Sequence, residues 1–373
     1  MIVLVIIIIV VITLISIQNY SNKYKLLEGH KDSKNNTDSK NTTDSKDNKD
    51  SKDNKDSIPD VKWPYINLKD EKGKNINMLC IRAYLITESE KEQFLKYYNS
   101  GIKFIGCSSN QSFPRVCDNK HGSCHIEKNI LINGKKIEDY VLGWCSCFKE
   151  PDKYIKSGIP KILISESDFC DTDYIKPNEN NNNKIYDYIT IQPKDGNSCD
   201  DGWYHYYKNW TLAQKCIKIF TDELGYKGLI VGRDDCPVRV DNINLVTVTK
   251  LLSYTELLDK MRQTKFILLP NLEEASPRVL TEALSLNVPI FLYDNILCGW
   301  KYLNDKTGIG FNENNISEKV QTLMENIKKD KYSPREYYIN NYGLKNSGKK
   351  LKDFLKKINP NLSKCKYVKF PIS

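Results

Sequence analysis

Two glutamates in the second half of the chain, Glu274 and Glu282, flank a predicted helix start. The apolar run at 266–269 indicates a buried strand, and a short acidic turn follows it. Ser276 is a favoured N-cap residue and Pro277 suits the first helical position, so we expect the helix to begin here. This order of elements leaves the free amides of a helix start at the carboxyl end of a strand.

Amides at Ala275 and Ser276, together with the helix dipole, would stabilise an anion. Two carboxylates beside an anion are unfavourable unless the ligand also offers hydroxyl groups. A nucleotide sugar offers both, because its diphosphate accepts from amides and its hydroxyls donate to carboxylates. The pattern therefore favours a nucleotide-sugar site. Two simpler alternatives stay open: Glu274 complements the helix dipole, and Glu282 lies on a solvated helix face.

The elements around these residues alternate between apolar runs and amphipathic stretches from about residue 77 onward. Such alternation is typical of parallel sheets with helical crossovers. We therefore expect an α/β fold of two doubly wound, Rossmann-like domains, with ligands at the carboxyl ends of the strands. The predicted domains are 76–198, with a last strand at 186–191, and 199–345. A basic helix and tail follow at 346–373, and the helix at 348–358 is expected to pack on the first domain.

The segment with the two glutamates resembles family 4 of the retaining glycosyltransferases, which have the GT-B fold. Glu274 and Glu282 match the family's E-x7-E arrangement. A strand that ends in Pro precedes Glu274, and Glu282 is the first residue of a Glu-Ala pair on the helix. The lead-in at 246–271, and the YKNW segment followed by GLIVG, are similar to the same family. The resemblance spans about residues 200–345. With the Ile-, Asn-, Lys- and Tyr-rich composition, it suggests a protein of a large DNA virus.

The resemblance implies a hexosyltransferase-like enzyme that uses a nucleotide sugar, retains configuration and needs no metal or other cofactor. Glu274 would be catalytic and contact the transferred sugar, whereas Glu282 would bind the ribose. Lys208 would hold the diphosphate with the amides of Ala275 and Ser276. The acceptor would be a glycan, a protein or a lipid. Segments 143–148 and 164–169 are candidates for the acceptor side.

The chain also departs from the family pattern. Ala275-Ser276 stands where the family has Gly-Phe, and the second basic residue upstream of Lys208 is missing. Arg233 or Arg278 would have to substitute for it. These departures keep a second hypothesis open, a catalytically inactive GT-B-like module that binds a glycan or a partner.

The first residues predict a membrane anchor. Residues 1–17 are almost entirely apolar, long enough to reach the lower limit for a bilayer crossing, so we expect a single transmembrane helix at 1–19. The alternative is a cleaved signal peptide, which is less favoured because no Lys or Arg precedes the apolar run and no small-residue cleavage site follows it. Residues 20–60 are predicted to be a disordered linker, since 31–57 hold seven Lys, seven Asp and no apolar residue. Lys23 and Lys25 follow the apolar run, which places the folded part on the cytoplasmic side by the positive-inside tendency.

The 12 cysteines leave three alternatives open: buried thiols, disulfides or a zinc site. The zinc alternative, and with it a third hypothesis of a zinc-stabilised interaction domain, rests on a dense group of Cys and His. Its members are Cys107, Cys117, His121, Cys124, His125, Cys145 and Cys147. No paired CxxC signature accompanies them, so structural zinc is the least favoured alternative.

The net charge of +9 is concentrated at the C-terminus, where residues 326–373 hold 13 Lys and Arg against 3 Asp and Glu. A nucleic-acid-binding protein spreads its basic groups over a folded groove. We therefore expect no nucleic-acid partner. The basic segment forms either a solvated helix face or a contact with anionic lipid.

Overall fold

The computed structural model describes residues 60–109, 113–114, 130–178, 183–196 and 198–371. The predicted anchor at 1–19 and all of the predicted linker except residue 60 lie outside these residues. Within the described part of the chain, no helix combines the length and the apolar character that a membrane crossing requires.

The first of two six-stranded sheets has the order β12-β1-β2-β3-β4-β5. Strands β2 to β5 are parallel, and β1 is antiparallel to both of its neighbours. The strands are β1 (Tyr65–Asp70), β2 (Asn75–Ile81), β3 (Lys103–Cys107), β4 (Val141–Ser146), β5 (Lys161–Leu163) and β12 (Val368–Lys369).

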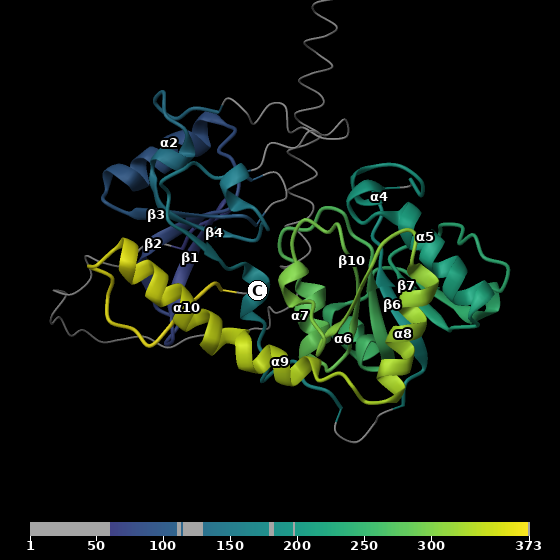
Figure 1. Cartoon of the computed structure of the whole chain (residues 1–373). Helices are drawn as coiled ribbons and strands as arrows, with labels where there is room; N and C mark the ends of the chain where they lie inside the picture. Colours follow the sequence, from purple (N-terminus) through teal and green to yellow (C-terminus); the bar gives the residue numbers. More distant parts are fainter. Residues whose placement is uncertain (1–59, 110–112, 115–129, 179–182, 197, 372–373) are drawn as a thin grey trace, which may run out of the picture. The chain divides into compact units, whose positions relative to one another are not determined.

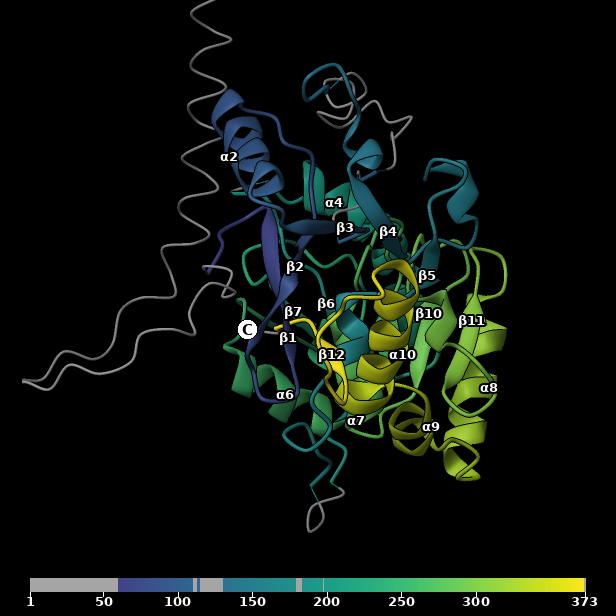
Figure 2. The same cartoon turned by 90° about the vertical axis from the view of Figure 1, so that its left-hand side faces the viewer.

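Helices cover the two faces of the first sheet (Figure 2). Helix α2 (Glu88–Asn99) begins with a capping box between Thr87 and Glu90, and its buried Phe94 packs on one face. Helix α10 (Gly343–Ile358) buries Leu351 and Leu355 against the other face, as predicted for the last helix. The C-terminal tail also adds β12 to this sheet, which the sequence did not predict. Short 3-10 turns follow the strands: η1 (Ile137–Asp139), η2 (Pro151–Lys153) and η3 (Glu166–Phe169).

The second sheet is parallel throughout and has the order β11-β10-β9-β6-β7-β8. Its strands are β6 (Tyr186–Ile191), β7 (Gly228–Val231), β8 (Val246–Thr249), β9 (Thr264–Leu269), β10 (Ile290–Tyr293) and β11 (Gly308–Phe311). The sequence analysis assigned the run at 186–191 to the first domain. That assignment is wrong, because β6 pairs with β7 and β9 in the centre of the second sheet.

Both faces of the second sheet are apolar because helices cover each of them (Figure 1). In β9, Phe266 and Leu268 join one apolar cluster, while Ile267 and Leu269 join the other. This explains the continuous apolar run of the strand. The helices and turns are α4 (Trp203–Tyr207), α5 (Trp210–Lys218), the π-turn η4 (Ile219–Glu223), η5 (Ile243–Leu245), α6 (Tyr254–Arg262), α7 (Arg278–Ser285), η6 (Trp300–Tyr302), α8 (Ile316–Lys328) and α9 (Pro334–Asn341).

The prediction of an α/β fold with two mostly parallel sheets is confirmed.

Candidate functional site

The loop that follows β9 brings Glu274 together with Lys208. The Nζ atom of Lys208 lies 2.5 Å from Oε2 of Glu274, and Nδ2 of Asn271 donates to the same oxygen at 2.9 Å. The two charged side chains are 22% and 19% exposed, so solvent reaches both of them. A partly exposed ion pair is open to exchange with a charged ligand.

Hydrogen bonds from the residues on both sides of Lys208 connect its turn to the loop after β9. Lys208 ends α4, and Asn209 caps α5 from a left-handed conformation (φ 53°). The side-chain amide of Asn209 donates to the carbonyl of Pro270 at 3.2 Å. In the other direction, the amide of Leu272 donates to the carbonyl of Tyr207 at 3.0 Å. The turn between α4 and α5 is therefore fastened to the loop on both sides of Lys208.

Among the described residues, no hydrogen bond uses the backbone N–H of Glu274, Ala275 or Ser276. Ser276 does not cap the helix as predicted, since α7 begins at Arg278 and the Ser276 hydroxyl accepts from the amide of Ser167 at 2.8 Å. The prediction of the N-cap is wrong because a tertiary hydrogen bond takes the capping hydroxyl.

Glu282 is a buried carboxyl group, with 7% of its surface exposed. It does not lie on a solvated helix face, so that alternative is excluded. Burial raises its pKa, while the charge of Arg278 and a hydrogen bond from Tyr254 act in the opposite direction. The neighbours of Glu282 come from the start of α6, which begins at Tyr254, and from α7. Those of Glu274 come from the end of α4 and from the loop after β9.

The two proposed substitutes for the missing basic residue differ in exposure. Arg233 is fully buried and donates to the carbonyls of Cys199 at 2.6 Å and Pro193 at 3.3 Å. Its guanidinium also stacks on the Trp210 ring, 4.4 Å from the centroid, and burial lowers the pKa of Arg233 to about 10. Arg278 is exposed at the first turn of α7. Of the two, Arg278 is the one that a soluble anion can reach.

Sequence reasoning missed Asn271 and Tyr254. Asn271 is fully buried, and its Oδ1 atom has no hydrogen-bond partner within the described residues. Its place directly after the strand and Pro270 was a signal, because polar residues at strand ends commonly line ligand sites. Tyr254 gave no such signal, since only the packing of α6 beside α7 brings it to Glu282.

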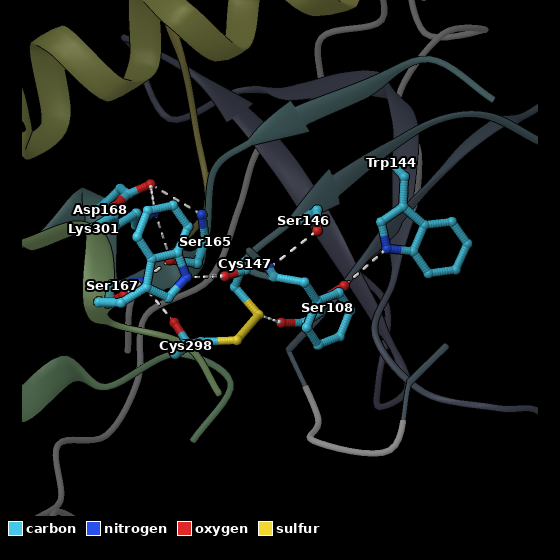
Figure 3. The surroundings of a disulfide bond; sticks show 12 residues. Ser108, Trp144, Ser146, Cys147, Ser165, Ser167, Asp168, Cys298 and Lys301 are labelled. Atoms are coloured by element: carbon cyan, nitrogen blue, oxygen red, sulfur yellow. Dashed lines mark hydrogen bonds and ion pairs between the residues drawn. A yellow bond between two sulfur atoms is a disulfide. The ribbon is translucent and has the colours of Figure 1, made fainter. Parts of the chain in front are cut away.

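Two disulfides join described cysteines, Cys147 to Cys298 and Cys199 to Cys236, with Cα–Cα distances of 5.4 and 5.5 Å. Figure 3 shows the first of them. Of the predicted zinc group, Cys147 is in this disulfide, and Cys107 and Cys145 are buried thiols. The other four members lie outside the described residues. A further cluster, Cys199 with Asp235 and Cys236, has metal-ligand spacing, but both of its sulfurs belong to the second disulfide.

No protein-family model and no curated protein sequence matches this chain. Solved structures do match. A glycosyltransferase from Rickettsia africae has a TM-score of 0.52 at 14% identity, over 76% of this chain and 77% of that one. HepE from Anabaena, solved with UDP and with UDP-glucose, has a TM-score of 0.52 at 9% identity, over 73% of this chain and 77% of HepE.

TarM, also solved from S. aureus with UDP, has a TM-score of 0.51 at 14% identity over 72% of this chain. This chain spans 53% of the length of TarM. The chain has the GT-B fold of these glycosyltransferases. At such low identity the similarity establishes the fold.

Proposed function

We propose that the protein is a glycosyltransferase that transfers a sugar from a nucleotide-sugar donor with retention of configuration and without a metal. The observation that carries this proposal is the set of amides at Glu274, Ala275 and Ser276, which have no partner among the described residues, beside the Lys208–Glu274 ion pair. Amides and an ammonium group together match a diphosphate, and the adjacent carboxylate matches sugar hydroxyls.

Each residue has a distinct role in this proposal. Lys208 and the loop amides bind the diphosphate and stabilise the charge that develops on it as the bond to the anomeric carbon breaks. Glu274 accepts hydrogen bonds from the transferred sugar. Glu282 accepts hydrogen bonds from the ribose hydroxyls, and these bonds would compensate its buried carboxylate for the hydration that burial removes. Arg278 adds positive charge at the start of α7.

UDP sugars are the first donors to test, because HepE has been solved with UDP and UDP-glucose. The full-length protein would be incubated with a panel of nucleotide sugars, and release of free sugar and nucleotide followed by chromatography. We expect hydrolysis or transfer with at least one donor, with the anomeric configuration retained by NMR. Turnover of none of them, despite nucleotide binding, would favour an inactive module.

That second candidate, a GT-B-like module that binds a glycan or a partner, has one observation in its favour. The Ser276 hydroxyl is engaged by Ser167, and Ala275 packs against the Cys147–Cys298 disulfide, so this loop differs from the Gly-Phe of the resembled family.

Two further parts complete the proposal of a glycosyltransferase. Residues 1–19 would anchor the protein in a membrane, and the acceptor would be a glycan, a protein or a lipid.

A further inference from the structure

A buried ion pair that the proposed reaction does not use lies near Ser276. Lys301 of η6 and Asp168 of η3 are 2.7 Å apart, and their side chains are 5% and 1% exposed (Figure 3). Removing two charges from water costs several kcal/mol per ion, and hydrophobic residues of similar volume often replace such pairs without loss of stability. A pair of this kind therefore calls for an explanation beyond stability.

Both members of the pair make further hydrogen bonds. The carboxylate of Asp168 accepts from the amide of Ser165 at 3.0 Å and from the hydroxyl of Tyr302. The ammonium group of Lys301 also donates to the Ser165 hydroxyl at 3.2 Å. A network with this many satisfied members has one arrangement, because each displacement would leave a buried polar group unpaired.

The network fixes Ser167 on two sides. The hydroxyls of Ser167 and Tyr302 are 2.8 Å apart, and Tyr338 of α9 donates to the Ser167 carbonyl at 2.8 Å. The remaining polar group of Ser167 is its amide, which donates to the Ser276 hydroxyl at 2.8 Å. A short chain of hydrogen bonds thus runs from the buried ion pair to the loop that holds the amides of Glu274, Ala275 and Ser276.

We propose that Asp168 and Lys301 are positioning residues for sugar transfer, which act through Ser167 to hold Ser276 and the loop amides in place. This inference rests on the proposed function. Donors that are fixed before the reaction stabilise developing charge without reorganisation, and displacement of a reacting group by about 1 Å can cost about 100-fold in rate. The two residues touch neither donor nor acceptor in this proposal.

The test is a double-mutant cycle, measured on the full-length protein. Tyr302→Phe removes one of the two hydroxyls that link the ion pair to Ser167, the other being that of Ser165, but keeps the ion pair. Ser276→Ala removes the hydroxyl that accepts from Ser167. The double variant Asp168→Asn with Lys301→Gln removes both charges at once, so that neither is left buried alone. Lys265→Met is the matched control, since Lys265 pairs with Asp187 at the amino-terminal ends of β9 and β6.

Two readouts are needed, the midpoint of urea unfolding and kcat with its accompanying KM. We expect Ser276→Ala to lower kcat about 10- to 100-fold with a smaller change in the donor KM. Tyr302→Phe or the charge-free variant should add little to the loss that Ser276→Ala causes, because all act through one path. Lys301→Arg, which keeps the charge beside Asp168, should retain most of the wild-type rate, and Lys265→Met should leave the rate unchanged.

Additive losses of kcat would overturn the positioning role, since they would mean that the pair and Ser276 affect the rate independently of each other. A lowered unfolding midpoint with unchanged kcat would overturn it as well, since the pair would then act on stability alone. Additive effects on the unfolding midpoint would overturn the physical link between the pair and Ser276, whether or not the protein is active. A wild-type protein with a coupled unfolding cycle but no turnover of any nucleotide sugar would instead refute the proposed function, and the positioning role with it.

Discussion

The ammonium nitrogen of Lys208 lies 2.5 Å from the carboxylate of Glu274, a residue 66 positions further along the chain. Asn271 donates to the same Oε2 atom. Among the described residues, no hydrogen bond or ion pair involves the other oxygen, Oε1. One oxygen is therefore held by the protein, while the other can accept from a ligand.

Replacing Glu282 with Ala should weaken nucleotide binding by about 1.5–3 kcal/mol, the usual contribution of hydrogen bonds to a charged group. The ribose hydroxyls would lose the buried carboxylate as their acceptor. Isothermal titration calorimetry with UDP measures the change. Glu325→Ala is the control, because Glu325 is two-thirds exposed on α8. Unchanged affinity in Glu282→Ala would remove Glu282 from the site.

Replacing Glu274 with Gln should lower the transfer rate about 100-fold or more, because the interaction strengthens as charge develops on the sugar. Nucleotide affinity should stay the same or increase, since the change frees Lys208 from its ion pair. Initial rates at saturating donor, compared with UDP binding by calorimetry, separate the two effects. Equal losses of rate and affinity would contradict a role specific to the transition state.

The stability of the protein should carry a pH dependence that Glu282→Gln removes. Burial raises the pKa of Glu282 above its usual 4.5, so the folded state binds a proton more tightly than the unfolded state does. The stabilisation is complete below pH 4.5 and is lost as the pH rises through the higher pKa of the folded state. Urea unfolding of wild type and Glu282→Gln across pH 4 to 8 gives the difference. A constant difference over this range would contradict the raised pKa.

Nucleotide binding should show the complementary effect. If ribose hydroxyls donate to Glu282, the bound nucleotide favours the ionised carboxylate, and binding releases a proton. UDP affinity should then increase as the pH rises through the raised pKa, and the heat of binding should depend on the ionisation enthalpy of the buffer. In Glu282→Gln both dependences should diminish.

The disulfides should contribute unequally to stability. They join residues separated by 151 positions (Cys147–Cys298) and by 37 positions (Cys199–Cys236). Chain-entropy arguments give about 5 kcal/mol for the first and about 4 kcal/mol for the second. Urea unfolding of the two double Cys→Ser variants tests this order. A larger loss from the Cys199 and Cys236 pair would contradict it.

The same disulfides bear on the compartment. Disulfides persist in oxidising compartments and are rare in the cytosol, so they argue against the cytoplasmic placement that Lys23 and Lys25 predict. Alkylation of the protein in intact cells, followed by mass spectrometry, decides between the two. Alkylated Cys147 and Cys298 would support the cytoplasmic placement, and linked cysteines would exclude it.

Local patterns predicted the elements well, because each depends on neighbouring residues. The helix expected at 348–358 lies within α10 (Gly343–Ile358), and the apolar run at 266–269 lies within β9. Strand pairing is not local. The run at 186–191 has the pattern of a buried strand in either domain, and only its pairing with β7 and β9 assigns it to the second sheet.

The candidate site shows the same limit. Residue spacing pointed to Glu274, and the family resemblance pointed to Lys208. The role of the Ser276 hydroxyl could not be predicted, because it accepts a hydrogen bond from Ser167, 109 positions away. The burial of Glu282 depends on packing of α7 that helix periodicity does not encode. Arg233 illustrates the converse, because a basic residue after a strand looked available for a ligand and is instead bonded to backbone carbonyls.

The donor site itself is tested most directly by calorimetry of UDP with the full-length protein and Lys208→Met. We expect a Kd for the wild type between about 1 μM and 1 mM, the usual range of KM values for enzyme substrates. Lys208→Met should weaken it at least about tenfold, the loss expected for a hydrogen bond to a charged group. Lys215→Met should not change it, since Lys215 of α5 donates to the carbonyl of Glu313. No binding of UDP or any other nucleoside diphosphate to the wild type, or equal binding by Lys208→Met, would contradict a donor site at Lys208.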